Sequence, residues 1–439
     1  MMVLGMRKVK ASIAIVMMTL DSCNSFFLRT PLMSVKSLNA RSAPTATRTA
    51  QAAAADVAQA PTEPHPTGAI SRTASSGHLL ELSFDDLAQT LGGSGRAKMV
   101  WAALAAGVDP FSEAAAEFVT SKTAEVLRDR IGGLPSRVVH ESVSSCGTRK
   151  LLVKLGDGME VETVIIPDLS GTRSTVCVSS QIGCAENCQF CMTGKMGLVR
   201  NLTAGEILSQ VFFARQIARE NEMPPLSNAV YMGMGEPLDN PKAVARSLEL
   251  LTHPFAFAMA KSKISVSTVG PSPAAIRRMK GLPSRLAWSV HAATDDVRRL
   301  LVPTTVNTMA ELRDAFADVF RSRPKEHLFV EVVLIEGLND SPDLARALAS
   351  LLRPLPSRAS INLLPYNDTG HPLFRASPKE AVEEFQRVLT GEGFVATIRT
   401  ARGDDESSAC GQLATSANRE RARKERHREP NSNAAAPPP

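Results

Sequence analysis

Hydrophobic residues in the second half of the chain follow two patterns that alternate along the sequence. Short apolar runs rich in β-branched residues predict buried strands, and stretches whose apolar residues recur every three to four positions predict helices. Because strands that alternate with helices form parallel sheets covered by those helices, we predict an α/β fold with a partial (β/α)6 barrel. The predicted strands are 174–180, 228–234, 263–269, 285–292, 328–335 and 359–366, extended by 394–400. The predicted helices include 203–220, 241–252, 273–280, 308–321, 341–352 and 378–391.

A different pattern precedes this region. Residues 80–147 carry helical stretches separated by Gly-rich and Pro-containing turns, and two apolar strands follow at 149–155 and 161–167. We therefore divide the body of the chain into a helical accessory domain at 80–147, connecting strands at 148–170 and a barrel at 171–414. The helical stretches are FDDLAQTL, RAKMVWAALAAGV and SKTAEVLRDRI.

The two ends of the chain lack these patterns. Residues 1–79 begin with basic residues and the apolar run ASIAIVMMTL, which is too short to span a bilayer but suits the core of a signal peptide. From Ser22 to Ala55 there is no acidic residue, which is typical of a transit peptide. The two signals in series resemble the bipartite presequence of algae with complex plastids. We expect a location in the plastid stroma, with a mitochondrial presequence or a disordered extension of a cytoplasmic protein as alternatives.

Residues 415–439 are polar and basic, and we expect them to be a disordered tail. No transmembrane segment is apparent, so we expect no membrane association of the mature protein.

Charge is distributed unevenly along the chain. Of the net charge of +6, residues 1–79 account for +5 and residues 411–439 for +3, which leaves −2 for residues 80–410. The body of the protein is therefore not basic, and contact with RNA would need a local patch or the tail. Aromatic residues make up 5% of the chain, which argues against a large base-stacking surface.

Four of the seven cysteines fall within residues 177–191. An odd, clustered set is typical of a metal or redox site in a reducing compartment rather than of a disulfide framework. Cys184, Cys188 and Cys191 form a C-x3-C-x2-C triplet. Three thiolates can hold three irons of a cubane iron–sulfur cluster and leave the fourth iron open. A zinc site is the alternative, and it needs a fourth ligand that the spacing does not supply.

Polar and Gly-rich residues collect directly after the predicted strands. The carboxyl ends of parallel strands meet at one rim, where barrels carry their chemistry. We therefore expect these residues to form one site, although His291 alone would equally suit a buried core position. They are the cysteine triplet, the GEPLDN segment, Ser267, Ser289 to His291, and Asn367.

Several motifs, in their order along the chain, resemble one family. The triplet, with Phe190 inside its last pair, is the hallmark of radical S-adenosylmethionine (SAM) enzymes. Over residues 80–414 the chain is similar to the radical SAM adenine C2 methyltransferases that act on large-subunit (23S-type) ribosomal RNA and on some tRNAs. The motifs are VSSQIGCAENCQFCMTGKMGLVRNLTAGEI (178–207), MGMGEPLDN (232–240), SVSTVG (265–270), WSVHAATDDVRRLLVP (288–303), INLLPYN (361–367) and RGDDESSACGQLA (402–414).

This resemblance implies a radical SAM barrel, an RNA-binding accessory domain and two cofactors, a [4Fe-4S] cluster and SAM. Cys184, Cys188 and Cys191 would bind the cluster, whose open iron holds SAM in this superfamily and supplies the electron that splits it to a 5′-deoxyadenosyl radical. The residues that would hold SAM are Gly235, Glu236, Ser267, Ser289, Val290, His291 and Asn367.

The resemblance also implies three catalytic residues. Cys410 would carry a methyl group from one SAM, lose a hydrogen from it to the radical, and add the resulting carbon to C2 of adenine. A radical is needed because C2 is an electron-poor carbon with no lone pair for a polar methyl transfer. Glu162 would remove the C2 proton, and Cys177 would release the product by forming a transient disulfide with Cys410. Without the resemblance, Cys410 is a free surface thiol and Glu162 a solvent-facing strand residue.

The target adenine has to be flipped out or single-stranded to meet the radical. We expect rRNA as partner, tRNA as a second substrate, an electron donor such as ferredoxin or flavodoxin, and a monomeric protein. Lys195 and Arg200 are candidates for phosphate contacts, with a solvated role as the alternative.

Three other functions are considered. The first is C8 methylation of the same kind of adenine by a sister branch of the family. The second is a radical SAM enzyme that activates another enzyme, which would need neither Cys410 nor Cys177. The third is a non-enzymatic, metal-stabilised RNA-binding module, which the few aromatic residues and the acidic body disfavour.

Overall fold

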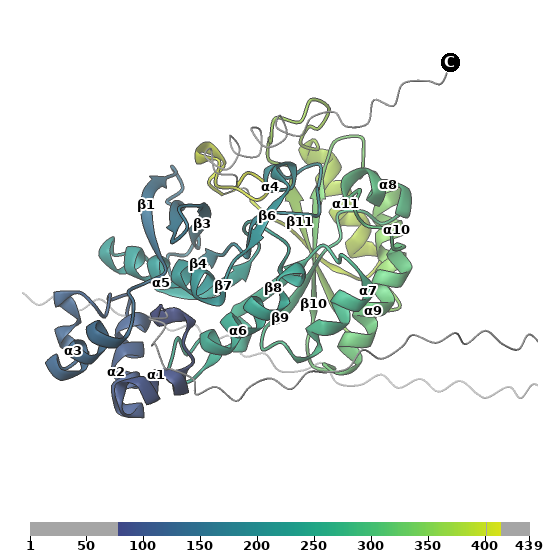
Figure 1. Cartoon of the computed structure of the whole chain (residues 1–439). Coiled ribbons are helices and arrows are strands. Elements are labelled where there is room, and N and C mark those ends of the chain that lie inside the picture. Colours follow the sequence, from purple (N-terminus) through teal and green to yellow (C-terminus); the bar gives the residue numbers. More distant parts are fainter. Residues whose placement is uncertain (1–77, 401, 414–439) are drawn as a thin grey trace, which may run out of the picture. The chain divides into compact units, whose positions relative to one another are not determined.

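A mixed sheet of ten strands runs through residues 78–400 and 402–413, the part of the chain that this computed structural model describes (Figure 1). From β4 onward every neighbouring pair of strands is parallel. This order confirms the predicted α/β fold, and each predicted strand of the barrel is present. The parallel strands, in their order across the sheet, are β4 (Ser174–Cys177), β7 (Leu226–Tyr231), β8 (Ile264–Thr268), β9 (Arg285–Ser289), β10 (Leu328–Leu334), β11 (Ala359–Pro365) and β12 (Val395–Ile398).

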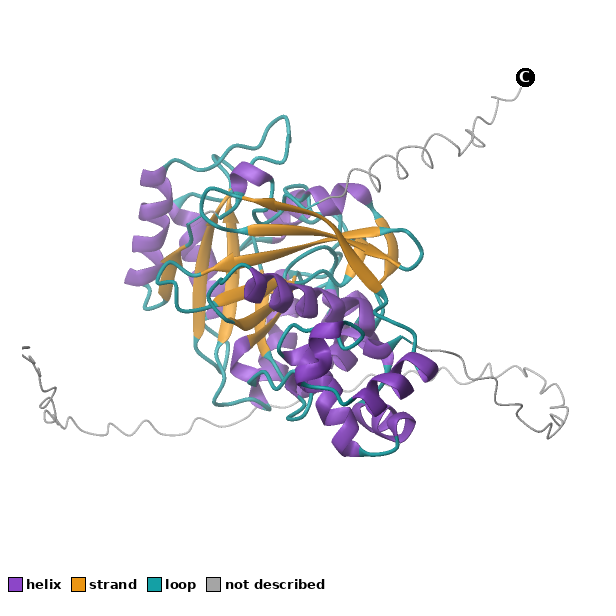
Figure 2. Cartoon of the chain, turned by 90° about the vertical axis from the view of Figure 1, so that its left-hand side faces the viewer, coloured by secondary structure: helices purple, strands orange, loops and turns teal. Residues whose placement is uncertain are grey.

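Amphipathic helices connect these strands and cover the sheet. α9, for example, buries Leu312, Phe316 and Phe320 and begins with a capping box at Thr308. Figure 2 shows the strands of the main sheet as one twisted layer with helices gathered outside it. The helices are α5 (Ala204–Glu220), α6 (Pro241–Thr252), α7 (Pro273–Arg277), α8 (Asp295–Leu301), α9 (Met309–Arg321), α10 (Pro342–Leu352) and α11 (Lys379–Gly391). Short 3-10 turns are η3 (Pro237–Asp239), η4 (Lys261–Lys263), η5 (Arg278–Gly281) and η6 (Asp404–Glu406).

Three antiparallel strands extend the sheet beyond β4. They are β1 (Ser136–Val143), β2 (Arg149–Leu155) and β3 (Glu160–Pro167). The helical domain was predicted to continue to residue 147, but residues 136–143 form strand β1, so the prediction is wrong for that stretch. This strand forms the edge of the sheet and leaves Val139 and Val143 exposed, so its sequence lacks the apolar run of a buried strand.

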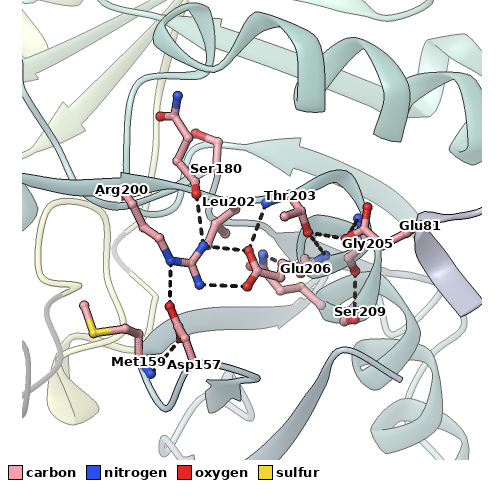
Figure 3. A network of polar contacts seen from close by, with 12 residues as sticks. Glu81, Asp157, Met159, Ser180, Arg200, Leu202, Thr203, Gly205, Glu206 and Ser209 are labelled. Atoms are coloured by element: carbon pink, nitrogen blue, oxygen red, sulfur yellow. Dashed lines mark hydrogen bonds and ion pairs between the residues drawn. The ribbon is translucent and has the colours of Figure 1, made fainter. Parts of the chain in front are cut away.

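The accessory helices are α1 (Phe84–Leu91), α2 (Ser94–Ala105) and α3 (Ser121–Arg130), with 3-10 turns η1 (Leu79–Glu81) and η2 (Glu113–Glu117). Their core includes the fully buried Trp101. Leu79 is also fully buried, so the accessory domain begins before residue 80, where it was predicted to start. Glu81 accepts hydrogen bonds from the Thr203 hydroxyl and from the backbone N–H of Gly205 at 3.2 Å, which joins η1 to the start of α5 (Figure 3).

The predicted presequence, apart from its last two residues, and the predicted basic tail lie outside the described residues. Among residues 78–400 and 402–413, no helix has both the length and the apolar character needed to cross a membrane.

Candidate active site

A small hairpin frames the cysteine loop, residues 184–191. Its strands are β5 (Gln181–Gly183) and β6 (Leu198–Asn201), and the short helix α4 (Met192–Met196) lies between the loop and β6. Gly183 has a φ of +73°, and a Cβ there would lie 1.8 Å from the Gly197 carbonyl oxygen. A Cβ on Gly194 would lie 2.8 Å from the backbone nitrogen of Cys188. These two glycines allow the segment to fold back tightly on itself.

The three thiols of the loop lie within electrostatic reach of one another. Burial raises the pKa of Cys188 well above its ordinary value, and charges on Cys191 and Cys184 add to this shift. Burial is also the main cause that raises the pKa of Cys184. The guanidinium of Arg298, itself almost fully buried, opposes the shift at Cys188. The loop therefore holds thiols that are costly to ionise unless positive charge binds them.

These thiols fit the [4Fe-4S] cluster that the sequence predicts. Cationic irons would relieve the repulsion between the thiolates and replace the solvation that they lose on burial. Within the described part of the chain no three His, Cys, Asp or Glu side chains converge closely enough to hold a single metal ion. The cluster geometry requires three thiolates around a larger body.

Gly235 and Glu236 lie after β7, against the same hairpin. A Cβ on Gly235, which has a φ of +99°, would lie 2.5 Å from Cβ of Gln181. The carboxylate of Glu236 accepts backbone N–H bonds from Leu238 at 2.9 Å and from Val269 at 3.0 Å. Burial raises the pKa of Glu236 to about 8. Since a carboxylate has about four acceptor sites, the side chain retains capacity for a cationic amino group, which would favour its ionised form.

The other predicted SAM residues at the ends of β8 and β9 lie close together. The hydroxyl oxygens of Ser267 and Ser289 are 2.9 Å apart, and the buried Val290 follows Ser289 directly. His291 has a φ of +51°, and its ring packs edge-on against Phe190 with the ring centroids 4.6 Å apart. Phe190 belongs to the cysteine loop, so this contact joins the loop to the strand ends.

His291 is neutral in this arrangement. Burial lowers the pKa of its ring to about 3, and Nδ1 accepts the backbone N–H of Val333 at 3.1 Å. The proton of the neutral ring is therefore on Nε2. Its backbone carbonyl accepts a bond from Asn339 at 2.7 Å, so His291 is fixed on both sides.

The Cys410 loop, residues 402–413, lies directly against the cysteine loop. The carbonyl of Gly411 accepts the backbone N–H of Met192 at 2.7 Å, and the Thr193 hydroxyl donates to the carbonyl of Leu413 at 2.6 Å. Asn367 donates from Nδ2 to the carbonyl of Cys410 at 3.0 Å. The side chain predicted to hold SAM therefore also holds the Cys410 loop.

Cys177 and Cys410 come together although 232 positions separate them in the sequence. Burial raises the pKa of Cys177 to about 12, and a charge on Cys410 contributes to that shift. Burial also raises the pKa of Cys410 to about 12, with contributions from Cys191 and Glu331. Although burial raises its pKa, Cys410 is accessible to solvent. We interpret this as a thiol that faces solvent on one side and is surrounded by protein on the others.

Glu162 occupies the same face of the sheet as Cys177. Cys177 pairs with Val164 of β3, and Lys150 of β2 pairs with Val164 from the other side. Side chains of paired residues and of residues two positions apart share a face. Glu162 is buried, and its Oε1 lies 3.4 Å from Nζ of Lys150. The three predicted catalytic residues are thus brought to one region by three separate segments.

Two groups of this site were not predicted. Glu331 is buried in β10, accepts a bond from Asn362 at 2.8 Å and acts electrostatically on Cys410. The only sequence signal was a glutamate inside an apolar strand. Arg298 lies within the motif WSVHAATDDVRRLLVP but was assigned no role; it donates to the carbonyls of Val290 at 3.0 Å and Val269 at 2.5 Å.

The structure places Arg200 in a supporting role rather than at a free surface. Its guanidinium binds Glu206 through two contacts of 2.8 Å and Asp157 through a third of 2.8 Å (Figure 3). These contacts join β6, the start of α5 and the turn between β2 and β3. The prediction that Arg200 grips phosphate is therefore not supported by its geometry. Lys195 donates to the carbonyl of Thr369 at 3.2 Å.

Comparisons with known proteins agree with this architecture. Residues 178–349 match the model of the radical SAM superfamily. The chain is 44% identical over 280 residues to the dual-specificity RNA methyltransferase RlmN of Marinobacter nauticus, an alignment that covers 63% of this chain and 75% of that protein. It is 40% identical over 311 residues to the protein of the same name from Dinoroseobacter shibae, with 69% and 77% covered. The crystal structure of a radical SAM methyltransferase from Sphaerobacter thermophilus is 36% identical, has a TM-score of 0.69, and covers 76% of this chain and 98% of its own.

Proposed function

We propose that this chain, which belongs to the RlmN family of radical SAM RNA methyltransferases, methylates C2 of an adenine in large-subunit (23S-type) rRNA through a methyl group carried on Cys410. The proposal includes tRNA as a second substrate, because the curated relatives are named dual-specificity enzymes. The observations that carry it are the backbone bond between Gly411 of the Cys410 loop and Met192, next to the cysteine loop, and the electrostatic interaction of Cys410 with Cys177 and with Cys191.

The enzyme uses a [4Fe-4S] cluster and SAM. When bound, these cofactors supply a methyl group and a one-electron route to a carbon radical. Cys184, Cys188 and Cys191 would hold the cluster, and Glu236 with the serine pair at the ends of β8 and β9 would hold SAM. The protein's own contribution is to place Cys410 beside this site and to control what its sulfur reacts with.

Three side chains then act on the RNA. The sulfur of Cys410 holds the carbon that becomes bonded to C2. Glu162 accepts the proton that leaves C2, and the unpaired electron left by the radical addition departs by the one-electron route that the cofactors supply. The thiolate of Cys177 forms a sulfur–sulfur bond with Cys410 while the bond between Cys410 and the carbon breaks. The electron pair of that broken bond remains on the carbon, which takes up a proton and becomes the methyl group. An external reductant then restores both thiols.

The electrostatics of the pair suit this order of events. At rest both thiols are neutral, because burial raises the pKa of each to about 12. The neutral thiol of Cys177 is a weak nucleophile, so it forms the disulfide only after it has lost its proton.

The same observation bears on the alternatives. A radical SAM activating enzyme has no use for paired thiols at Cys177 and Cys410, and their approach disfavours that function. C8 methylation would use the same residues, so the regiochemistry has to be measured.

The test is anaerobic reconstitution of the enzyme with iron, sulfide, SAM, a reductant and large-subunit rRNA, followed by analysis of the nucleosides. We expect 2-methyladenosine. Formation of 8-methyladenosine, or no methylated adenosine by enzyme that carries an intact cluster, would overturn the proposal. Parallel reactions with tRNA test the second substrate.

We also propose a plastid location, a monomeric enzyme and reduction by a ferredoxin or flavodoxin. Residues 1–79 fused to a fluorescent protein should direct it into the plastid of an alga with complex plastids, and secretion or a mitochondrial signal would contradict that location. Size-exclusion chromatography with light scattering tests the monomer, and replacement of the chemical reductant by each electron carrier tests the donor.

A further inference from the structure

We propose that Lys150 is a positioning residue that joins the general base Glu162 to the Cys410 loop, so that the base and the methyl carrier keep a fixed relation during release of the RNA adduct. The inference rests on the proposed function, because it takes Glu162 as the base and Cys410 as the carrier. It concerns a residue that no motif singled out.

The ammonium group of Lys150 has partners on both sides. Its Nζ lies 3.4 Å from Oε1 of Glu162 on the neighbouring strand. The same Nζ donates to the carbonyl of Glu406 at 2.8 Å and to that of Ser407 at 3.3 Å, both in the Cys410 loop. One cation therefore bridges two segments that are about 250 positions apart in the sequence.

Low solvent exposure strengthens this bridge. The Lys150 side chain is 17% exposed and that of Glu162 is 9% exposed. Removing one partner of a mostly buried ion pair leaves the other charge poorly solvated, which is far more costly than the loss of a surface pair. Lys150 therefore favours the ionised carboxylate that can accept a proton, and its geometry restricts where that carboxylate lies.

The surrounding contacts show that this part of the Cys410 loop docks on the β1–β2 hairpin. The backbone N–H of Ser145 donates to the carboxylate of Asp405 at 2.8 Å. A Cβ on Gly403, whose φ is +73°, would lie 3.0 Å from Cγ2 of Thr148. Lys150 lies on the strand that follows this contact, and it is the member of the group that reaches Glu162.

The other end of the loop is held independently. Asn367, Met192 and Thr193 bind residues 410–413 without involving Lys150. Loss of Lys150 should therefore leave Cys410 beside the cysteine loop, where it can still receive a methyl group. The expected defect lies in the later step, which needs Glu162 and Cys410 together.

The experiment follows two stages of the reaction in Lys150→Met, Lys150→Arg and Glu162→Gln enzymes that carry the full cluster. Mass spectrometry measures methylation of Cys410 before RNA is added, and denaturing gels measure RNA covalently attached to protein afterwards. For Lys150→Met we expect Cys410 methylation within about twofold of wild type and breakdown of the adduct slowed by about tenfold or more. Lys150→Arg, which keeps the charge and can reach both partners, should recover much of the rate.

Lys154→Met is the matched control. Lys154 lies on the same face of β2 as Lys150. Like Lys150, it is two residues from Leu152, the residue of β2 that pairs with Glu162. Lys154 pairs with Glu160 across β2 and β3, and no contact joins it to the Cys410 loop among the described residues, so its loss should leave both stages unchanged. The double variant Lys150→Met/Glu162→Gln should be no slower than Glu162→Gln alone, because the two residues act as one unit.

Two results would overturn the inference: adduct breakdown in Lys150→Met at the wild-type rate, or an equal loss of Cys410 methylation and of adduct breakdown that Lys150→Arg fails to rescue. If Lys150→Met does not fold, Lys150→Gln is judged by the same criteria. A wild-type enzyme that fails to methylate Cys410 or to form 2-methyladenosine refutes the proposed function instead, so the two failures are distinguishable.

Discussion

The cysteine loop and the pair formed by Cys177 and Cys410 are two thiol sites built in opposite ways. The loop gathers its thiols within eight consecutive residues, and two glycines with close backbone contacts fix its fold. The pair is assembled from β4 and from a loop near the end of the barrel. Local sequence can therefore encode the metal site, whereas only the completed sheet brings the second pair together.

The difference has a chemical consequence. A cluster site needs three thiolates at a fixed spacing, and a short loop supplies this spacing before the rest of the protein is considered. In the proposed function Cys410 carries the methyl group and Cys177 resolves the adduct; these two steps occur at different moments, so each thiol needs its own environment. Their separate supports, β4 for one and a loop docked on α4 and β2 for the other, provide this.

The largest effect is expected at the cysteine loop. Cys184→Ala should lose the iron–sulfur absorption of the reconstituted protein and all SAM cleavage, because the cluster loses one of three ligands. Iron content and visible absorption measure the change. Cys146→Ala is the control, because Cys146 lies outside the cysteine loop and its thiol hydrogen-bonds to Ser144 and Thr148. Wild-type iron content in Cys184→Ala would show that the cysteine triplet does not bind the iron–sulfur cluster.

The second site should fail differently. Cys177→Ala should keep its cluster and its SAM cleavage, yet form less than about one product per enzyme and accumulate RNA attached to Cys410. Peptide mapping of the attached RNA identifies the residue, and Cys177→Ala/Cys410→Ala should show no attachment. Repeated turnover by Cys177→Ala would show that Cys177 has no role in product release and is only a buried residue of β4.

A smaller effect tests how the hairpin supports the loop. Gly183→Ala should lower the free energy of unfolding by about 2–5 kcal/mol and reduce iron binding, because a Cβ would collide with the Gly197 carbonyl at a φ of +73°. Gly158→Ala is matched in backbone conformation, with a φ of +82° and no atom within 4 Å of the added Cβ. It should cost only about 1–2 kcal/mol. Denaturant unfolding measures both, and equal losses would contradict the role of the close contact.

The smallest effect concerns pH. Burial raises the pKa of Glu236 from 4.5 to about 8. Between these values the folded protein without cofactors binds a proton that the unfolded chain has released, so its free energy of unfolding falls as the pH rises. In Glu236→Gln this fall between pH 5 and 8 should be smaller by an amount on the order of 2 kcal/mol. Parallel stability curves for the two proteins would show that Glu236 does not titrate in this range.

Much of the fold could be predicted from the sequence because its main elements carry strong patterns. The predicted bounds of α6 and β2 coincide with those observed, and both elements present a continuous apolar face to the core. β1, β5 and β6 were missed. β5 and β6 have only three and four residues, too few to show a period, and the edge strand β1 has no buried residue.

The site divides in the same way. The triplet and the glutamate of GEPLDN belong to short motifs, so resemblance to a family assigns them roles. Lys150 and Glu331 have no such signal, because their importance depends on contacts with residues far away in the sequence. The role predicted for Arg200 in phosphate binding failed for a related reason, since its partners Asp157 and Glu206 approach it only in the fold.

The pairing of Cys177 with Cys410 is tested most directly by mapping disulfides after a single turnover without added thiol reductant. We expect a peptide pair linked through Cys177 and Cys410 in an amount equal to the 2-methyladenosine formed. Methylated adenosine formed while both thiols remain free to react with an alkylating reagent would contradict it.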